Sequence, residues 1–302
     1  MMLDQREEED FLKRLLMKRR KQIQALIDIS QRIGISKAYI QGGGGNTSVK
    51  LNKNLMAIKS SGTNLKDMSE EYGHCIVDFR MVNKFLNKND VEENKFSEMI
   101  NSFSKDEKNR PSIETGFHSL LGKFVIHTHS VFVNVLLCSK EGKKMIKQLF
   151  PDSIWIDYHT PGRNLTLALK EKLEKIKETS NEEIIVFLQN HGLIVSSSKH
   201  LRCLELHEKI NGRIIDSFSL EDFKIYSSDK CIDKKILFPD QVVYLDKKDK
   251  TFSEAAIETA SALSYILNQI KKLHLTPNYL SLEDIKTLKN MESEKFRKSL
   301  VN

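Results

Sequence analysis

Three histidines stand where a folded chain could bring them to one metal ion. His127 and His129 flank one threonine in KFVIHTHS, which predicts a strand, and alternate side chains of a strand share a face. His191 follows the apolar run IIVFL and precedes a glycine, so we expect it at the end of a buried strand. Three neutral imidazoles with one open coordination position are typical of catalytic zinc, which polarises carbonyl groups. Without His191, the other two would be ordinary strand histidines.

Glu114 is the candidate acid–base residue. The segment SIETGFHSLLGK predicts a helix capped by Ser112, with Glu114 in the first turn, where the helix dipole favours an acid. His118 is expected on the surface of that helix. Because the helix runs into the His-Thr-His strand, Glu114 could face the metal, and catalysis would require burial to raise its pKa towards neutrality. The alternative is a surface glutamate that only stabilises the helix.

A glycine-rich loop is a candidate anion site. The run QGGGGNTS ends in Gly45 and Asn46 and then two hydroxyl residues, and its backbone N–H groups can form a nest for an anion. It matches neither a Walker motif nor a dinucleotide-binding fingerprint. Lys59, Ser61 and Gly62 end the next apolar run and add a positive charge and hydroxyls that suit a phosphate or carboxylate. A flexible turn is the alternative.

Short strands and amphipathic helices must position these residues. Apolar patterns predict strands at 48–51, 55–59, 76–78 and in LFPDQVVYL, two strand segments in EEIIVFLQNHGLIVSSS, and helices near 11–27, 164–178, 201–210 and 253–273. Residues 80–110 indicate a loop with a short helix, and Ser281 begins a capping-box-like helix start. We therefore expect a mixed α/β domain at 1–225 and a C-terminal strand–helix extension at 226–302.

Composition indicates a soluble globular protein. The 302 residues are 39% apolar and 29% charged, and no apolar run approaches the ~18 residues that span a bilayer. The first thirty residues mix both charges, unlike a signal peptide, and four widely spaced cysteines indicate reduced thiols. The net charge of +7 suits an anionic substrate, whereas only 8% aromatic residues and no recognisable motif argue against nucleic acid. We expect a cytoplasmic protein without membrane or nucleic-acid partners.

Five short motifs together identify a family resemblance. In order and spacing, GGGGNTSVK, IKSSGT, PSIE, HTH and NHG resemble the class II aldolase/adducin family across about residues 20–220. The likeness is greatest to the aldolase part of bifunctional rhamnulose-1-phosphate aldolase/short-chain dehydrogenase proteins. It extends to SGTNLKDM and to the tail segments LFPDQVVYL and MESEKFRKSL.

The resemblance implies a fold and a site. The fold would be a three-layer α/β/α class II aldolase-like domain with a central, mostly antiparallel sheet, commonly assembled as a homotetramer with sites between subunits. His127, His129 and His191 would bind Zn²⁺ or another divalent metal, and Glu114 would be the acid–base residue. The substrate phosphate would lie against Asn46, Ser61, Gly62 and Ser112.

Two positions complete the expected site. Family members that bind a phosphate often carry a second hydroxyl directly before the glutamate, where this chain has Ile113. That departure leaves room for another anionic head group, with Lys59 as a compensating charge. The aldehyde oxygen needs a proton donor, which in the family is often a tyrosine of a neighbouring subunit. Tyr158 is the nearest candidate, with a packed aromatic side chain as its alternative.

The implied activity is a zinc-dependent lyase that cleaves a ketose 1-phosphate, of the rhamnulose or fuculose type, to dihydroxyacetone phosphate and an aldehyde. Zinc would stabilise the enediolate charge left when C3–C4 breaks. The family uses related chemistry for epimerases, dehydratases and decarboxylases of sugar phosphates or sugar acids, so these remain alternatives. A non-catalytic adducin-like interaction module is less favoured, because the three histidines and the glutamate are all present.

Overall fold

One seven-stranded sheet organises the parts of the chain that the computed structural model describes, residues 5–88, 91–105, 109–176, 183–226, 235–245 and 253–299. The strand order is β3-β2-β1-β4-β7-β6-β5, and only the β5–β6 pair is parallel. The expected mostly antiparallel sheet is therefore confirmed. The strands are β1 (Asn46–Lys50), β2 (Leu55–Lys59), β3 (His74–Asp78), β4 (Phe124–Thr128), β5 (Ile154–Ile156), β6 (Ile184–Leu188) and β7 (Gly192–Ser197).

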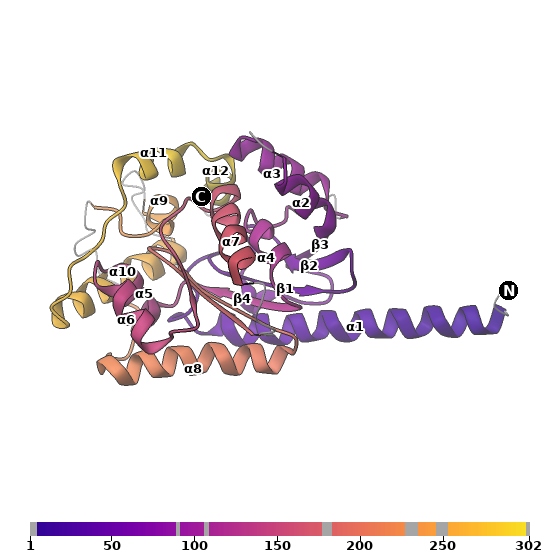
Figure 1. Cartoon of the computed structure of the whole chain (residues 1–302), viewed down its shortest axis with the longest axis horizontal. Helices are drawn as coiled ribbons and strands as arrows, with labels where there is room; N and C mark the ends of the chain where they lie inside the picture. Colours follow the sequence, from indigo (N-terminus) through magenta and orange to yellow (C-terminus); the bar gives the residue numbers. More distant parts are fainter. Residues whose placement is uncertain are drawn as a thin grey trace.

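Helices cover both faces of this sheet. Figure 1 shows α1 and α8 along one face and α2, α4 and α7 on the other, which makes the three layers that were expected. The helices are α1 (Gln5–Ile35), α2 (Phe79–Leu86), α3 (Glu93–Ser102), α4 (Thr115–Leu120), α5 (Val131–Leu137), α6 (Gly142–Leu149), α7 (Arg163–Ile176), α8 (His200–Phe218), α9 (Asp240–Tyr244), α10 (Glu254–Lys272), α11 (Leu282–Asn290) and α12 (Glu292–Ser299). A 3₁₀ turn, η1, spans Leu65–Asp67.

The central strand β4 shows why the layers form. Its residues alternate between faces, as strand geometry requires: Ile126 packs with the apolar side chains of α1, α5 and α8, while Val125 packs with those of α4 and α7. His127 follows Val125 at a spacing of two, so its ring lies beside Phe117 of α4, with ring centroids 5.5 Å apart. The strand period therefore directs His127 to the α4 face.

The C-terminal elements share the main core. Leu237, Ile266 and Ile270 belong to the same buried apolar cluster as α1, α5 and α8, and α10 lies against α5. Figure 1 places α9, α11 and α12 in the same part of the molecule, beyond α10. Within the described residues, no helix is long and apolar enough to cross a membrane.

Two local predictions are confirmed. The helix expected at 253–273 is α10, where the Ser253 side chain accepts a hydrogen bond from the backbone N–H of Ala256, and Ser281 and Asp284 form the capping box that begins α11. Cys75, Cys138 and Cys203 are free and buried, and Cys231 lies outside the described residues.

Three local predictions are wrong. The segment expected as a strand in LFPDQVVYL is helix α9, because Pro239 has φ near −56° and no N–H to donate, which suits a helix start. The helix after Pro111 begins at Thr115, with Glu114 as its N-cap and not inside its first turn. Residues 80–110 hold most of α2 as well as α3, because the Asp78 carboxylate accepts from Met81 N and caps α2.

Candidate active site

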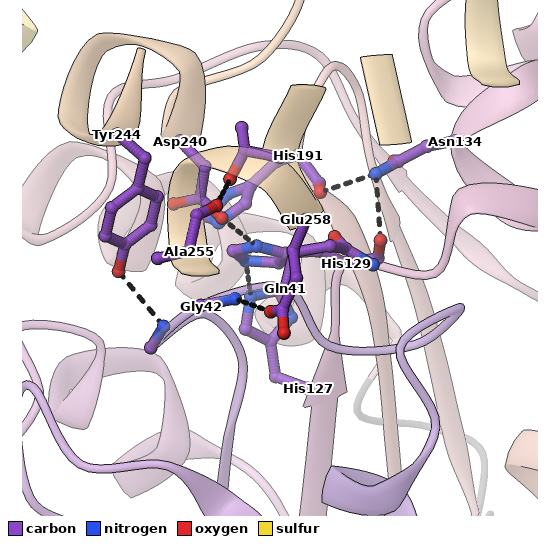
Figure 2. A network of polar contacts seen from close by, with 12 residues as sticks. Gln41, Gly42, His127, His129, Asn134, His191, Asp240, Tyr244, Ala255 and Glu258 are labelled. Carbon is purple, nitrogen blue, oxygen red and sulfur yellow. Dashed lines mark hydrogen bonds and ion pairs between the residues drawn. The ribbon is translucent and has the colours of Figure 1, made fainter. Parts of the chain in front are cut away.

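The three predicted histidines converge at one end of the sheet. His127 lies on β4, and His129 lies just beyond the last residue of that strand. His191 is in the β6–β7 turn, after Asn190, which adopts the left-handed conformation (φ 55°) that asparagine tolerates. The Asn134 amide of α5 donates to the His191 carbonyl at 3.2 Å and to the His129 carbonyl at 3.4 Å (Figure 2). One side chain thus ties the two loop histidines together.

The distances among the three rings fit a metal ion. One nitrogen of each buried histidine lies within 4.8 Å of the others. The Nε2 atoms of His127 and His129 are 3.2 Å apart, close to the ~3.3 Å between two nitrogens on one tetrahedral zinc. Burial holds the pKa of His127 well below its ordinary value, so the ring is the neutral imidazole that a metal needs.

The outer contacts of the rings fix which nitrogens are available. His127 Nδ1 lies 3.1 Å from the Leu193 carbonyl, and His129 Nδ1 lies 2.6 Å from the Asp240 carboxylate. Both acceptors take a hydrogen bond from Nδ1, which leaves the Nε2 atom of each ring available as a ligand. These two Nε2 atoms lie close enough for one ion to bind both, so the residues present fit a divalent metal.

Glu114 faces the same point. Its Oε1 atom lies 3.1 Å from His191 Nε2 and 3.6 Å from His127 Nε2, and the side chain is buried. Burial raises the pKa of Glu114, but the neighbouring His127 and His191 outweigh it and hold that pKa well below its ordinary value. The expected rise towards neutrality is therefore wrong. Glu114 is therefore an ionised carboxylate at neutral pH.

A buried polar network orients Glu114. Asn46 pairs with His127 across β1 and β4, and its amide nitrogen donates to Glu114 Oε2 and, at 3.2 Å, to Ser112 Oγ. The Asn46 oxygen contacts His118 Nε2, and His118 Nδ1 lies 2.7 Å from Ser48 Oγ. His118 is therefore fully buried, and the predicted surface position is wrong. Because burial lowers its pKa to about 3, it stays neutral and holds the Asn46 amide in one orientation.

The predicted anion-binding residues line one cavity with Glu114, His129 and His191. This cavity wall includes all six residues that the sequence indicated for substrate, Gly45, Asn46, Lys59, Ser61, Gly62 and Ser112. Ile113 also lines it. The Lys59 ammonium donates to the Gly43 carbonyl at 3.0 Å, and burial together with nearby Arg297 lowers its pKa to about 7. The cavity thus holds a cation whose charge changes near neutral pH.

Tyr158 lies elsewhere. Its ring packs in a small apolar cluster formed with α9 and α11 residues, including Leu288 and Ile285, and it is not part of the cavity wall. Within the described residues its hydroxyl has no hydrogen-bond partner, and burial raises its pKa above the ordinary value. Ile113 belongs to the same cluster and to the cavity wall, so it separates the two environments. The role of Tyr158 as proton donor stays a prediction.

The C-terminal elements add cavity residues that sequence reasoning missed. Asp240 of α9 and Ser293, Glu294 and Arg297 of α12 line the cavity. Figure 2 shows Asp240 beside His129, and Tyr244 reaching from α9 to the glycine-rich loop, where its hydroxyl accepts from Gly43 N at 3.1 Å. The Pro239-Asp240 step could have predicted that a helix, α9, begins there, because proline favours helix starts. The family resemblance of the tail segments LFPDQVVYL and MESEKFRKSL was a second available signal.

Comparison with known proteins shows which family the chain matches. The family described as "Class II Aldolase and Adducin N-terminal domain" matches residues 24–211. The uncharacterized oxidoreductase YuxG of Bacillus subtilis (strain 168) is 25% identical over 215 residues, 64% of this chain but only 30% of that protein. The matched region thus spans less than a third of that relative's length.

Two solved structures are similar to the chain to different degrees. The N-terminal class II aldolase domain of a conserved protein from Thermoplasma acidophilum superposes with a TM-score of 0.56 at 21% identity, covering 65% of this chain and 92% of that one. L-fuculose-1-phosphate aldolase from Thermus thermophilus gives a TM-score of 0.42 at 15% identity, with coverages of 66% and 94%.

The family match contains the residues of the candidate metal site. Residues 24–211 make up more than half of the chain and include the three histidines and Glu114, together with the glycine-rich loop. Asp240 and Arg297 lie outside it. The chain belongs to the class II aldolase and adducin N-terminal domain family.

Proposed function

We propose that this protein is a zinc-dependent lyase that cleaves a ketose 1-phosphate to dihydroxyacetone phosphate and an aldehyde. The observation that carries the proposal is the convergence of two histidine Nε2 atoms on Glu114 Oε1, with the third histidine beside them, next to an anion-binding wall. Such an arrangement would bring a metal, a base and a phosphate pocket together in one cavity.

The residues suggest a division of roles. Zinc held by His127, His129 and His191 would polarise the substrate carbonyl and stabilise the negative charge that develops on its oxygen. In the condensation direction, Glu114 removes a proton from C3 of dihydroxyacetone phosphate, and its ionised state suits that step. The new C3–C4 bond then forms as the aldehyde oxygen gains a proton. Cleavage is the reverse sequence.

The phosphate would bind to the cavity residues that carry a positive charge or hydrogen-bond donors. Lys59 supplies the charge, and Ser61, Gly62 and Ser112, which line the same cavity, supply donors. Asn46 holds Glu114 Oε2, which leaves Oε1 facing the histidines. The chain thus fixes the carboxylate before substrate arrives.

A retro-aldol screen tests the proposal. Ketose 1-phosphates are incubated with zinc-loaded protein, with dihydroxyacetone phosphate and aldehyde as readouts, in parallel with a chelator-treated sample. We expect product with at least one sugar and none after chelation. Metal-replete protein that contains no zinc or other divalent ion would overturn the proposal.

One observation favours a second activity. The family's second phosphate-binding hydroxyl is replaced by Ile113, which lines the cavity with an apolar side chain. The same carbanion chemistry could then act on a sugar acid or its phosphate, as in a decarboxylase, epimerase or dehydratase. The screen therefore includes sugar-acid phosphates, with carbon dioxide and epimer formation as additional readouts.

Lys59 is expected to give the reaction a pH dependence. Because its pKa in the folded protein is about 7, Lys59 loses its charge as the pH rises through neutrality. Binding of an anionic substrate then weakens, so kcat/KM should fall by up to about tenfold per pH unit above 7. The Lys59→Met variant should show a low kcat/KM that does not fall further above pH 7. If its kcat/KM fell with pH as in the wild type, Lys59 would not be the group responsible.

Polar groups of α12 are proposed to bind the sugar hydroxyls. Among the described residues, Ser293 Oγ and Glu294 Oε1 are buried without a hydrogen-bond partner, and both residues line the cavity. Bound hydroxyl groups would satisfy them. Ser293→Ala is expected to raise KM roughly three- to tenfold with little change in kcat. A change in kcat alone, measured by steady-state kinetics, would argue against this role.

We also propose a cytoplasmic homo-oligomer, a tetramer in the form implied by the family. Exposed apolar residues support self-association: Leu15, Leu16 and Met17 of α1 are 47%, 65% and 62% exposed. Figure 1 shows this part of α1 extending away from the sheet.

Residues 1–225 are proposed as the catalytic domain and 226–302 as an extension that completes the cavity. The partner is a small anionic sugar, with no nucleic acid or membrane.

A further inference from the structure

A buried chain of ionic contacts links α12 to one of the metal-binding histidines. Asp240 places Oδ2 at 2.6 Å from His129 Nδ1 and Oδ1 at 2.8 Å from the Arg297 guanidinium. Asp240 is 2% exposed, so neither contact is open to solvent. The carboxylate therefore has both oxygens committed, one to the histidine and one to the arginine.

Arg297 is itself fixed by further contacts. It donates to Glu294 at 2.9 Å and to the Tyr244 hydroxyl at 3.2 Å, and the Tyr244 hydroxyl accepts from Gly43 N. The guanidinium is thus held in a planar fork between two carboxylates. Such a fixed partner holds Asp240 in one rotamer, aimed at the histidine.

His129 is the ligand that most needs an outer partner. His127 lies within β4, where strand register fixes its backbone, and its Nδ1 faces the Leu193 carbonyl of the neighbouring strand. His129 lies beyond the end of β4, so the sheet does not fix its ring. A carboxylate that accepts from Nδ1 sets the tautomer and the orientation of a metal-binding histidine and makes its other nitrogen a stronger ligand.

The glycine-rich loop leaves room for this pair. A side-chain carbon added at Gly44 would lie 2.8 Å from His129 Nδ1 and 2.9 Å from Asp240 Oδ2, both closer than carbon atoms approach such groups. Glycine at position 44 therefore lets the loop pass over the histidine–carboxylate pair. The contact between Asp240 and His129 therefore requires that position 44 carry no side chain.

We propose that Asp240, held by Arg297, is a positioning residue for the metal ligand His129. The extension outside the family domain would thereby set how tightly the metal is held. This inference depends on the proposed function, because it requires that the histidines bind a metal.

Zinc affinity tests the proposal without any substrate. The purified full chain is stripped of metal and titrated with zinc against a chromophoric chelator. Asp240→Ala is expected to weaken zinc binding about 10- to 100-fold, with Asp240→Asn intermediate, because an amide oxygen still accepts from Nδ1 but carries no charge. Arg297→Met should weaken it by a smaller factor. The visible spectrum of cobalt-substituted protein should change in Asp240→Ala, since ligand geometry changes.

Gln241→Ala is the matched control. Gln241 is the next residue of α9, equally buried, and its side chain accepts from Leu237 N and Phe238 N without touching His129. This variant should lower the melting temperature yet keep zinc affinity within about twofold of wild type. An equal loss of zinc affinity in Gln241→Ala and Asp240→Ala would overturn the proposal, because any damage to α9 would then suffice.

The outcomes separate the two levels of inference. Wild-type protein that binds no zinc overturns the proposed function itself. Wild-type protein that binds zinc, with Asp240→Ala binding equally tightly, overturns only the positioning role. Should Asp240→Ala fail to fold, the isosteric Asp240→Asn and the more distant Arg297→Met decide by the same titration, and unchanged affinity in both overturns the role.

Discussion

Replacement of His127 by alanine is expected to remove bound zinc and reduce turnover to background. The wild-type protein should hold about one zinc per chain, and two remaining imidazoles leave too few protein ligands for a catalytic site of this kind. His127 also contributes one of the two Nε2 atoms that lie 3.2 Å apart, so its loss leaves His129 without a facing nitrogen. Metal content after dialysis and retro-aldol activity are the measurements.

His207 provides a matched control for this substitution. It is also fully buried, but it lies on α8 and contacts Thr128 Oγ1 at 3.0 Å from the opposite face of β4. His207→Ala should lower the melting temperature, because it leaves a cavity and an unpaired hydroxyl, and it should retain zinc. Retention of a full zinc equivalent by His127→Ala would refute the predicted ligand set.

Glu114→Gln is expected to keep zinc but lose turnover by roughly 10²- to 10⁴-fold, the range that general acid–base catalysis contributes. The amide fills the same space and can still accept from the Asn46 amide, but it cannot take a proton from C3. Exchange of the C3 proton of dihydroxyacetone phosphate with deuterated solvent isolates this step. We expect exchange in the wild type and a matching loss in the variant.

Glu258 provides the matched control for the Glu114→Gln substitution. It is buried, accepts from Gly42 N at 2.7 Å and pairs with Lys37, but it lies on α10 and does not line the cavity. Glu258→Gln should therefore affect stability more than proton exchange. If Glu114→Gln exchanged the C3 proton at the wild-type rate, another residue would have to be the base.

The positions of His127 and His191 could be predicted because their signals are local. A strand period of two places His127 on one face, and a turn after an apolar run places His191 at a strand end. Ser281 likewise begins α11 through its contact with Asp284, three residues further along the chain. In these cases the sequence pattern and its structural consequence lie within one turn or one strand.

The missed features arise from contacts between distant segments. His118 has the spacing of an exposed helix residue, and only Ser48 and Asn46 of β1, about 70 positions away, make its burial favourable. Asp240 and Arg297 meet 57 positions apart. The low pKa of Glu114 likewise depends on its proximity to histidines of two other segments, which composition and periodicity do not reveal.

The wide sequence separation of the cavity residues has a consequence for biosynthesis. The residues that line the cavity run from Gly43, early in the sequence, to Arg297, near the end of the described residues. While the polypeptide emerges from the ribosome, the three imidazoles are translated long before α12, so an ion captured during translation would be held without its outer support. If Asp240 and Arg297 position His129 as proposed, the metal site would be complete only after α12 has been synthesised.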